Sequence, residues 1–315
     1  MIRVGLVGAR GYVGAEMLGL LAQHASIEVA LATSAEAAGK RVAEHVPAFA
    51  AKDPSLTFES LEPEAAGARA LDVVVLGLPN GKSAPWIRAF SERSPRTLIV
   101  DLSADHRFDE DWVYGQPEQN RARIRDARRI ANPGCYATAS ELAILPIKEL
   151  VDGFATVFGV SGYSGAGATP SPKNDPAVLR DNLLPYALVD HVHEREIRRA
   201  LGVDVDFIPH VAPFFRGITV TVSLRLKPGR SARALRDLYE ARYAEERLVK
   251  VTEEIPLVRD IAGSHEVRIG GFTATGDGRH AVVVATIDNL LGGAATQALR
   301  NINLASGLPE LEGIH

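Results

Sequence analysis

The stretch Val4-Gly5-Leu6-Val7-Gly8-Ala9-Arg10-Gly11-Tyr12-Val13-Gly14 starts with a short apolar run and continues into three evenly spaced glycines. An uninterrupted aliphatic run is typical of a parallel strand that is buried on both faces. Glycines at this G-x-x-G-x-x-G spacing allow a tight turn into a helix and let the backbone approach the pyrophosphate of a dinucleotide. A turn without a ligand could carry the same glycines, but their position after a first strand favours a nucleotide site. We expect its contacts to come from Gly8, Arg10, Gly11, Tyr12, Val13 and Gly14.

The pattern that begins at this stretch repeats along the first 134 residues. Aliphatic runs recur at residues 29–32, 73–78 and 98–100, and helical patterns at residues 14–22 and 83–91 separate them. Repeated strand-helix units predict a doubly wound parallel sheet, that is, an α/β Rossmann-type domain.

The pattern changes after Cys135. A helix is expected over residues 136–150. Residues 217–226 then alternate strictly between apolar and polar, which predicts an antiparallel strand with one face in the core. A further helix over 232–245 and strands near 267–275 and 281–287 predict an α+β domain with a mixed, largely antiparallel sheet. The last small-residue helix, 293–306, could pack on either domain.

Composition narrows the possible partners. The 315 residues, 46% of them hydrophobic, suffice for two domains with buried cores. The 35 Lys and Arg against 39 Asp and Glu give a net charge of −4 with interspersed signs, which argues against nucleic-acid and membrane partners. No apolar run approaches the roughly 18 residues of a membrane span. The single cysteine excludes an internal disulfide and a Cys-based zinc site, so we expect a cytoplasmic protein without a metal.

Nucleotide specificity should be set at the end of the second strand. An acid there would accept the ribose 2′-OH, whereas a cation would bind a 2′-phosphate. The strand ends in Thr33 and Ser34, Lys40 and Arg41 follow, and Glu36 is the only nearby acid that could support NAD. Two hydroxyls and two cations against one acid predict NADP, with contacts from Thr33, Ser34 and Lys40.

The only cysteine lies in Asn132-Pro133-Gly134-Cys135-Tyr136-Ala137-Thr138, a turn directly before a helix. The partial positive charge and free N–H groups of a helix N-terminus lower the pKa of a thiol. A lone intracellular cysteine is more often an inert apolar group. The turn-then-helix context nevertheless favours a nucleophile at Cys135.

A nucleophilic cysteine needs an acid/base partner. His210 is fixed between two prolines in Phe207-Ile208-Pro209-His210-Val211-Ala212-Pro213, although a turn histidine with a local hydrogen bond is the alternative. His191 and His193 lack metal-ligand spacing, and a helix would put their rings on different faces, so we expect a helix start near the substrate pocket instead of a metal site. Three other histidines, His24, His45 and His280, stand in polar, surface-like contexts.

Six segments together resemble the motifs of the N-acetyl-gamma-glutamyl-phosphate reductases, within a superfamily that includes aspartate-semialdehyde dehydrogenases and phosphorylating glyceraldehyde-3-phosphate dehydrogenases. The cysteine turn and the Pro-His segment before Arg216-Gly217 are the most specific. The segments are residues 8–14, 101–107, 132–138, 161–167, 207–217 and 289–303.

This resemblance implies reduction of an acyl phosphate to an aldehyde by NADPH in arginine biosynthesis. The Cys135 thiolate would attack the acyl carbon, expel phosphate and form a thioester, while His210 would manage the proton on the substrate oxygen. Arg107 would contact the leaving phosphate. Weaker substrate contacts would come from Ser103, Ser164 and Arg216, and Asn289 would lie close to the nicotinamide.

The resemblance also implies a domain arrangement. Residues 1–134 with 290–315 would form the NADP-binding domain, and residues 135–289 the catalytic and oligomerisation domain of a homodimer or homotetramer. Three positions depart from the family pattern: Asn80, Ala168 and Gly292 replace a histidine, an arginine and a lysine, with Lys173 as a substitute cation for the second. A related acyl phosphate, aspartyl or N-acyl-aminoadipyl, stays open as the substrate. A nucleotide-binding redox sensor that oxidises Cys135 is the alternative from a different class.

Overall fold

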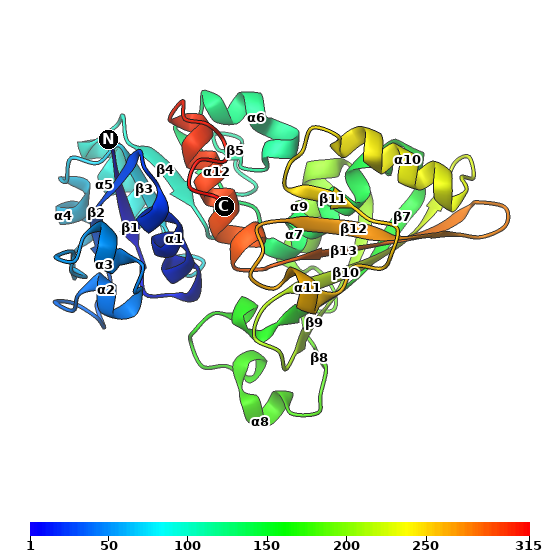
Figure 1. Ribbon diagram of the computed structural model, residues 1–315, viewed down its shortest axis with the longest axis horizontal. Coiled ribbons are helices and arrows are strands. Elements are labelled where there is room, and N and C mark those ends of the chain that lie inside the picture. The colour runs from blue at the N-terminus through cyan, green and yellow to red at the C-terminus, as the bar shows by residue number, and fades with distance from the viewer. The chain divides into compact units, whose positions relative to one another are not determined.

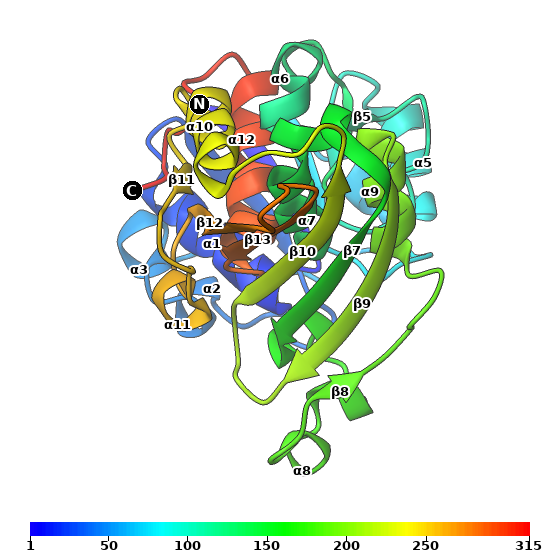
Figure 2. The ribbon, with the colours of Figure 1, turned by 90° about the vertical axis from the view of Figure 1, so that its right-hand side faces the viewer.

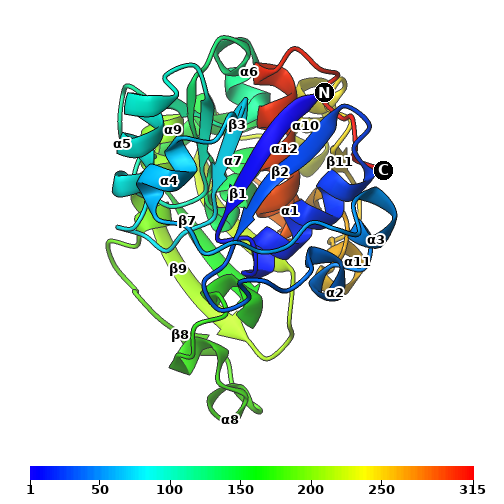
Figure 3. The ribbon, with the colours of Figure 1, turned by 90° about the vertical axis from the view of Figure 1, so that its left-hand side faces the viewer.

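The aliphatic run at the start of the chain forms β1 (Ile2–Val7), which lies between β2 (Ile27–Thr33) and β3 (Val73–Leu76). Figure 3 shows these three strands side by side, with α1 (Tyr12–Gln23) against one face. Every strand pair in this sheet is parallel, in the order β2-β1-β3-β4-β6-β5. The predicted doubly wound sheet is confirmed. Its other strands are β4 (Leu98–Asp101), β5 (Val113–Tyr114) and β6 (Arg129–Ala131).

The computed structural model describes all residues from 1 to 315, and the chain forms two units, Met1–Pro133 with Ala294–His315, and Gly134–Gly293 (Figure 1). Apolar side chains of α1, among them Met17, Leu18 and Leu21, are fully buried against the parallel sheet. Burial of each such side chain contributes about 1.5–3 kcal/mol. The remaining helices of this unit are α2 (Val42–His45), α3 (Phe49–Lys52), α4 (Pro63–Gly67), α5 (Ala84–Arg93), α6 (Pro117–Arg125) and α12 (Thr296–Ala305).

The last helix, α12, belongs to the unit that contains the parallel sheet. Leu299 and Ile302 of α12 are buried in the same core as β1, and the helix contacts α6, α1 and β4. A fully buried His24 contacts α12 itself, since its Nε2 lies 3.0 Å from Oδ1 of Asn303. The expectation that His24 is a surface residue is therefore wrong, because its polar neighbours in sequence conceal partners from the other end of the chain.

The second unit contains a seven-stranded mixed sheet in the order β11-β12-β13-β10-β7-β9-β8. Figure 2 shows β10, β7 and β9 as its broad face. The predicted alternating strand is β10 (Ile218–Leu226), antiparallel to both neighbours, with its apolar residues buried. The other strands are β7 (Val151–Gly162), β8 (Leu184–Pro185), β9 (Asp204–Ala212), β11 (Val249–Val251), β12 (Val267–Ala274) and β13 (His280–Ile287).

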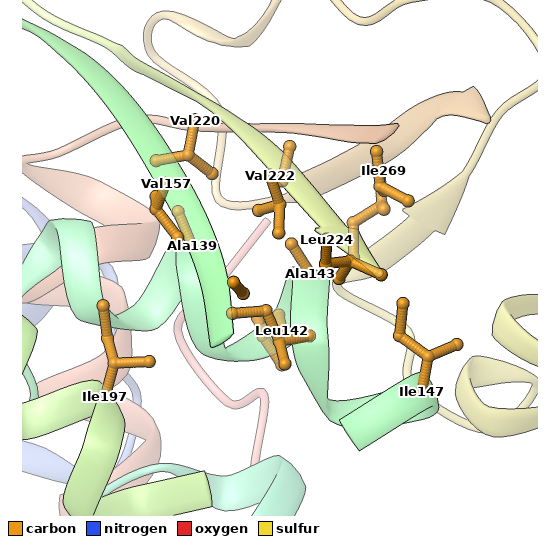
Figure 4. Close-up of a cluster of buried hydrophobic side chains, with 14 of the residues drawn as sticks. Ala139, Leu142, Ala143, Ile147, Val157, Ile197, Val220, Val222, Leu224 and Ile269 are labelled. Atoms are coloured by element: carbon orange, nitrogen blue, oxygen red, sulfur yellow. The ribbon is translucent and has the colours of Figure 1, made fainter. Parts of the chain in front are cut away.

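One face of this sheet is covered by α7 (Cys135–Ile144), which is buried along its length. Figure 4 shows Leu142 and Ala143 of α7 among Val157 of β7 and Val222 and Leu224 of β10. The helix predicted over 136–150 continues from α7 as a 3₁₀ helix, Leu145–Leu150. The remaining helices are α8 (Pro176–Leu179), α9 (Val192–Leu201), α10 (Ala232–Tyr243) and α11 (Val258–Ile261), with 3₁₀ turns at Tyr163–Ala166 and Pro172–Asn174 and a π turn at Leu291–Ala295. None of the helices combines the length and apolar character that a membrane span requires.

Candidate active site

The glycine-rich loop between β1 and α1 has a conformation that requires glycine. Gly8 has φ +78°, and a Cβ there would lie 2.3 Å from the carbonyl oxygen of Gly77. A Cβ on Gly14 would lie 2.6 Å from the oxygen of Ala9. Gly11 is the N-cap of α1 and brings no side chain to the helix start, and no acidic residue stands in the first turn. This cradle fits a dinucleotide pyrophosphate, because the backbone can approach the ligand at the positive end of a helix.

The end of β2 carries the residues expected to choose the nucleotide. Arg10 forms an ion pair with Glu36, so the acid that follows the strand in sequence is engaged by a cation of the loop. A second acid, Glu59, is bridged to Thr33 at the strand end and is paired with Arg69. Thr33 accepts a hydrogen bond from the Gly8 amide at 3.3 Å, and Ser34 accepts one from the Ala37 amide at 3.2 Å. Lys40 is exposed. Both hydroxyls thus stabilise the local backbone.

The segment after β4 forms a hydrogen-bonded loop around the buried carboxylate of Asp101. Ser103 donates to Asp101 at 2.9 Å, and Nδ1 of His106 lies 2.8 Å from the same carboxylate. Arg107 donates from Nε to the carbonyl oxygen of Asn132 at 2.9 Å and from Nη2 to that of Leu102 at 3.0 Å. Ser103 and Arg107 are therefore tied into the protein, and Arg107 directly fixes the start of the cysteine turn.

The cysteine turn places Cys135 as the first residue of α7, with Gly134 as its N-cap. A Cβ on Gly293 would lie 2.6 Å from Cβ of Cys135, so a glycine is needed beside the cysteine. The Gly134 amide donates to Oε1 of Glu196 at 2.8 Å. The thiol thus lies at the positive end of a ten-residue helix, where thiolate is stabilised.

A cluster of polar side chains surrounds the start of α7. Tyr136 contacts the ring of His193, with ring centroids 5.9 Å apart. Tyr186 is linked to this cluster by its ring contact with His191, at 5.5 Å between centroids. Burial, and to a smaller degree the charge of Cys135, raises the pKa of Tyr186 far above its ordinary value. Nζ of Lys173 lies 4.8 Å from the centroid of the Tyr186 ring. Two of the substrate residues predicted from the sequence are thus connected to residues around the cysteine: Lys173 through Tyr186, and Arg107 through the carbonyl oxygen of Asn132.

The pair His191 and His193 differs from the sequence-based expectation. His191 is the N-cap of α9 and lies outside the helix, so its ring is close to that of His193, with centroids 4.8 Å apart, instead of on a different face. Burial, with smaller contributions from the cations Lys173 and Arg195, lowers the pKa of His191 to about 4. His191 is therefore neutral at pH 7. No group of three His, Cys, Asp or Glu side chains is arranged to hold a metal.

His210 lies in β9, and its ring is on the face of the sheet that carries Phe158. Phe158 is in register with Ile208, two residues from His210, and the two rings are 4.6 Å apart. Tyr136 instead packs on Phe207, which points to the opposite face. The link between His210 and the cysteine helix is its backbone: the Tyr136 hydroxyl donates to the His210 carbonyl oxygen at 2.6 Å.

Arg216, Asn289 and Ser164 form a hydrogen-bonded group that is linked to Gly293, because the Gly293 amide donates to the carbonyl oxygen of Asp288 at 2.9 Å. Arg216 makes a bidentate ion pair with the fully buried Asp288, at 2.6 and 3.0 Å. Asn289 accepts from the Gly217 amide at 2.7 Å and donates to Ser164 at 2.9 Å. These contacts hold the strand ends together, so the three predicted ligand contacts also have structural tasks.

The residues around the cysteine that the sequence analysis missed are Tyr186, His193 and Glu196. The segment His191-Val192-His193-Glu194-Arg195-Glu196 contains two of them, and the sequence predicted a helix start near the substrate pocket there without a role for either residue. Glu194 and Glu196 are buried near the helix start, which hydropathy alone does not reveal. Tyr186 follows a two-residue strand in a long loop, where no periodicity exists.

Comparisons with known proteins agree over both units. Residues 3–127 match the semialdehyde dehydrogenase NAD binding domain, and residues 135–289 match the semialdehyde dehydrogenase dimerisation domain. N-acetyl-gamma-glutamyl-phosphate reductase from Xanthomonas campestris pv. campestris is 53% identical over 311 residues, which cover 99% of this chain and 98% of that protein. The protein of the same name from Xylella fastidiosa is 51% identical, covering 99% of this chain and 94% of its own length.

Solved structures share the fold at low sequence identity. Aspartate semialdehyde dehydrogenase II from Vibrio cholerae superposes with a TM-score of 0.79 at 18% identity, covering 98% of each chain. Aspartate semialdehyde dehydrogenase with NADP from Candida albicans gives a TM-score of 0.73 at 16% identity, covering 99% of each chain.

Proposed function

The chain belongs to the family of N-acetyl-gamma-glutamyl-phosphate reductases, and we propose that its cysteine turn carries the chemistry of that family. The protein is an oxidoreductase of arginine biosynthesis that reduces N-acetyl-gamma-glutamyl phosphate to N-acetylglutamate 5-semialdehyde with release of phosphate. The observation that supports the chemistry is the position of Cys135 at the N-terminus of α7, against Gly293.

In the proposed mechanism the Cys135 thiolate attacks the acyl carbon, the carbon–oxygen bond to phosphate breaks, and a thioester to Cys135 remains. A nicotinamide cofactor, when bound, supplies the hydride that reduces this thioester to a thiohemiacetal. The thiohemiacetal then collapses as the carbon–sulfur bond breaks, which releases the aldehyde and restores the thiolate. The helix N-terminus stabilises that thiolate in both steps.

Two histidines are candidates for the proton on the substrate oxygen. His210 is the candidate from the sequence, and its proline-flanked strand supports a fixed side chain. His193 is the candidate from packing, because its ring contacts Tyr136, the residue after the cysteine. The contact on the cysteine side of the sheet favours His193. Lys173 would meet the anionic groups of the substrate, and Arg107 would contact its phosphate.

We propose NADP as the cofactor. The loop Gly8 to Gly14 would hold its pyrophosphate, and Lys40 and Arg41 would meet a 2′-phosphate. The pairing of Glu36 with Arg10 supports this choice, since that acid is engaged elsewhere. The relative from Candida albicans was solved with NADP.

We also propose a homodimer or homotetramer and a cytoplasmic location. Residues 135–289 match a dimerisation domain, and Phe154 and Phe158 are exposed on the face of the sheet opposite α7. Light scattering during gel filtration tests the assembly. The single cysteine and the biosynthetic reaction support the cytoplasm.

The reaction run in reverse tests the function. Purified protein is given N-acetylglutamate 5-semialdehyde, NADP and phosphate, and NADPH formation is followed, with aspartate semialdehyde in a parallel arm. We expect turnover that depends on phosphate and on the N-acetylated substrate. Phosphate-independent turnover would contradict the acyl-phosphate mechanism. A preference for aspartate semialdehyde would contradict the assignment of the N-acetylated substrate. Cys135→Ser should abolish turnover and retain NADP binding.

A further inference from the structure

Two glutamates of α9 are buried and turn their carboxylates toward backbone amides outside their own helix. Glu194, 6% exposed, accepts from the amide of Phe207 at 3.0 Å. Glu196, 1% exposed, accepts from the amide of Gly134 at 2.8 Å. The first bond holds the strand β9, whereas the second holds the residue that precedes Cys135.

The Gly134 amide needs this acceptor. Gly134 is the N-cap of α7 in an extended conformation, φ −74° and ψ 148°, so its amide precedes the hydrogen-bonded turns of the helix. A buried N–H that loses its partner carries the full cost of desolvation. A carboxylate is also a stronger and more directional acceptor than a neutral oxygen. Glu196 therefore fixes the N-cap from one side.

Other contacts leave Cys135 little freedom. The carbonyl oxygen of Gly134 accepts a hydrogen bond from the Thr138 hydroxyl at 3.0 Å, and Gly293 lies directly against Cβ of Cys135. The Gly134 amide is held by Glu196. This hydrogen bond therefore sets the direction in which the Cys135 side chain leaves the helix. A displacement of about 1 Å in a reacting group can cost about a hundredfold in rate.

We propose that Glu196 is a positioning residue for the nucleophile: its carboxylate, through the Gly134 amide, holds the Cys135 sulfur in line with the acyl carbon. This inference rests on the proposed function, because it assigns Glu196 a part in that reaction. In this proposal Glu196 acts through the Gly134 backbone. Removal of the acceptor should therefore lower kcat more than it changes KM.

Three substitutions of Glu196 distinguish a role in positioning Cys135 from a role in the stability of the fold. Glu196→Gln keeps an acceptor oxygen at the same reach, Glu196→Asp withdraws it by one methylene, and Glu196→Ala removes it. We expect Glu196→Asp and Glu196→Ala to lower kcat about tenfold to a hundredfold with KM for both substrates within about twofold. Glu196→Gln should stay within about threefold of wild type in kcat. The matched control is Glu194→Ala, which removes an equally buried carboxylate of the same helix and should lower the melting temperature with kcat within about threefold.

A second measurement does not depend on turnover. Because Cys135 is the only cysteine, its alkylation by iodoacetamide in the folded protein can be followed by mass spectrometry. Slower alkylation in Glu196→Asp than in Glu196→Gln supports the proposal. Equal alkylation and kcat in these two variants, or a loss in Glu194→Ala as large as in Glu196→Ala, would overturn it. Wild-type protein without reductase activity would contradict the proposed function, while the alkylation rates would still decide the role of Glu196.

Discussion

The hydroxyl of Tyr136 donates to the backbone carbonyl oxygen of His210 over 2.6 Å. This bond joins Tyr136, the residue after the nucleophile, to the backbone of β9. Burial, with smaller contributions from Tyr186 and Cys135, raises the pKa of Tyr136 well above its ordinary value. The phenol therefore stays protonated and remains a donor at every pH at which the enzyme works.

Tyr136→Phe should destabilise the protein. The substitution keeps the ring but leaves the carbonyl oxygen of His210 without this donor, which costs about 1–3 kcal/mol. Urea unfolding of wild type and variant measures the difference. Tyr163→Phe is the control, because Tyr163 makes a ring contact with Phe215 and its hydroxyl has no such task. Equal unfolding midpoints for Tyr136→Phe and wild type would show that the bond contributes nothing.

Two histidine variants distinguish the candidates for proton transfer. We expect His193→Asn to lower kcat by about 10²–10⁴-fold, the usual contribution of a general acid/base. His210→Asn should change kcat by less than about tenfold, since its ring lies against Phe158. Steady-state kinetics in the reverse direction measures both. If His210→Asn shows the large loss and His193→Asn does not, the assignment from the sequence is right and the assignment from packing is wrong.

Local hydrophobic patterns in the sequence predicted most of the helices and strands correctly. The aliphatic runs gave β1 to β4, and the alternation from Ile218 to Leu226 gave β10, because both depend on burial that repeats along a strand. The twelve-residue β7 was not predicted, since its exposed Phe154 and Phe158 interrupt the apolar-polar alternation. Around the cysteine, the sequence predicted the residues of its own turn, together with Lys173, Arg107 and Arg216. Tyr186, His193 and Glu196 come to that turn from loops and helices far along the chain, and such contacts leave no local period.

Gly8→Ala should impair cofactor binding without unfolding the protein. A Cβ at φ +78° is strained, and it would lie 2.3 Å from the carbonyl oxygen of Gly77, so the loop must shift. We expect the dissociation constant for NADPH, measured by fluorescence titration, to rise at least about tenfold, which corresponds to about 1.4 kcal/mol. Gly19→Ala is the control: nothing lies within 4 Å of its Cβ position, and it should stabilise α1 by up to about 1 kcal/mol. Unchanged NADPH affinity in Gly8→Ala would argue against a pyrophosphate site at this loop.

Lys40→Ala tests the proposed choice of NADP. Loss of a cation that meets the 2′-phosphate should lower kcat/KM for NADPH by about tenfold, the value of one charge-assisted contact. The value for NADH should stay within about twofold, because that cofactor lacks the phosphate. Wild-type protein is measured with both cofactors in parallel. A wild-type preference for NADH would overturn the choice of NADP, whatever the effect of the substitution.

The segment after α12 is held by an ion-pair network with a defined pH dependence. Glu310 accepts from Nε of Arg121 at 2.7 Å and from Nη2 of Arg300 at 2.6 Å, and Arg300 also donates to Glu118 at 2.7 Å. Burial alone would raise the pKa of Glu310, but the two arginines outweigh it and lower the pKa below its ordinary value of 4.5. Because the folded pKa is the lower one, the stabilisation is complete above the ordinary value and is lost as the pH falls through the folded value.

Glu310→Gln should remove this pH-dependent part of the stability. At pH 7 we expect the free energy of unfolding to fall by about 2–3 kcal/mol, since two arginines lose their shared charge partner. Between about pH 5 and pH 3 the variant should lose stability less steeply than wild type, because one carboxylate with a lowered pKa is gone. Urea unfolding at several pH values measures both effects. Glu240→Gln, in an exposed pair with Arg236, is the control and should leave the pH profile unchanged. Parallel profiles for Glu310→Gln and wild type below pH 5 would show that the network does not respond to protonation of Glu310.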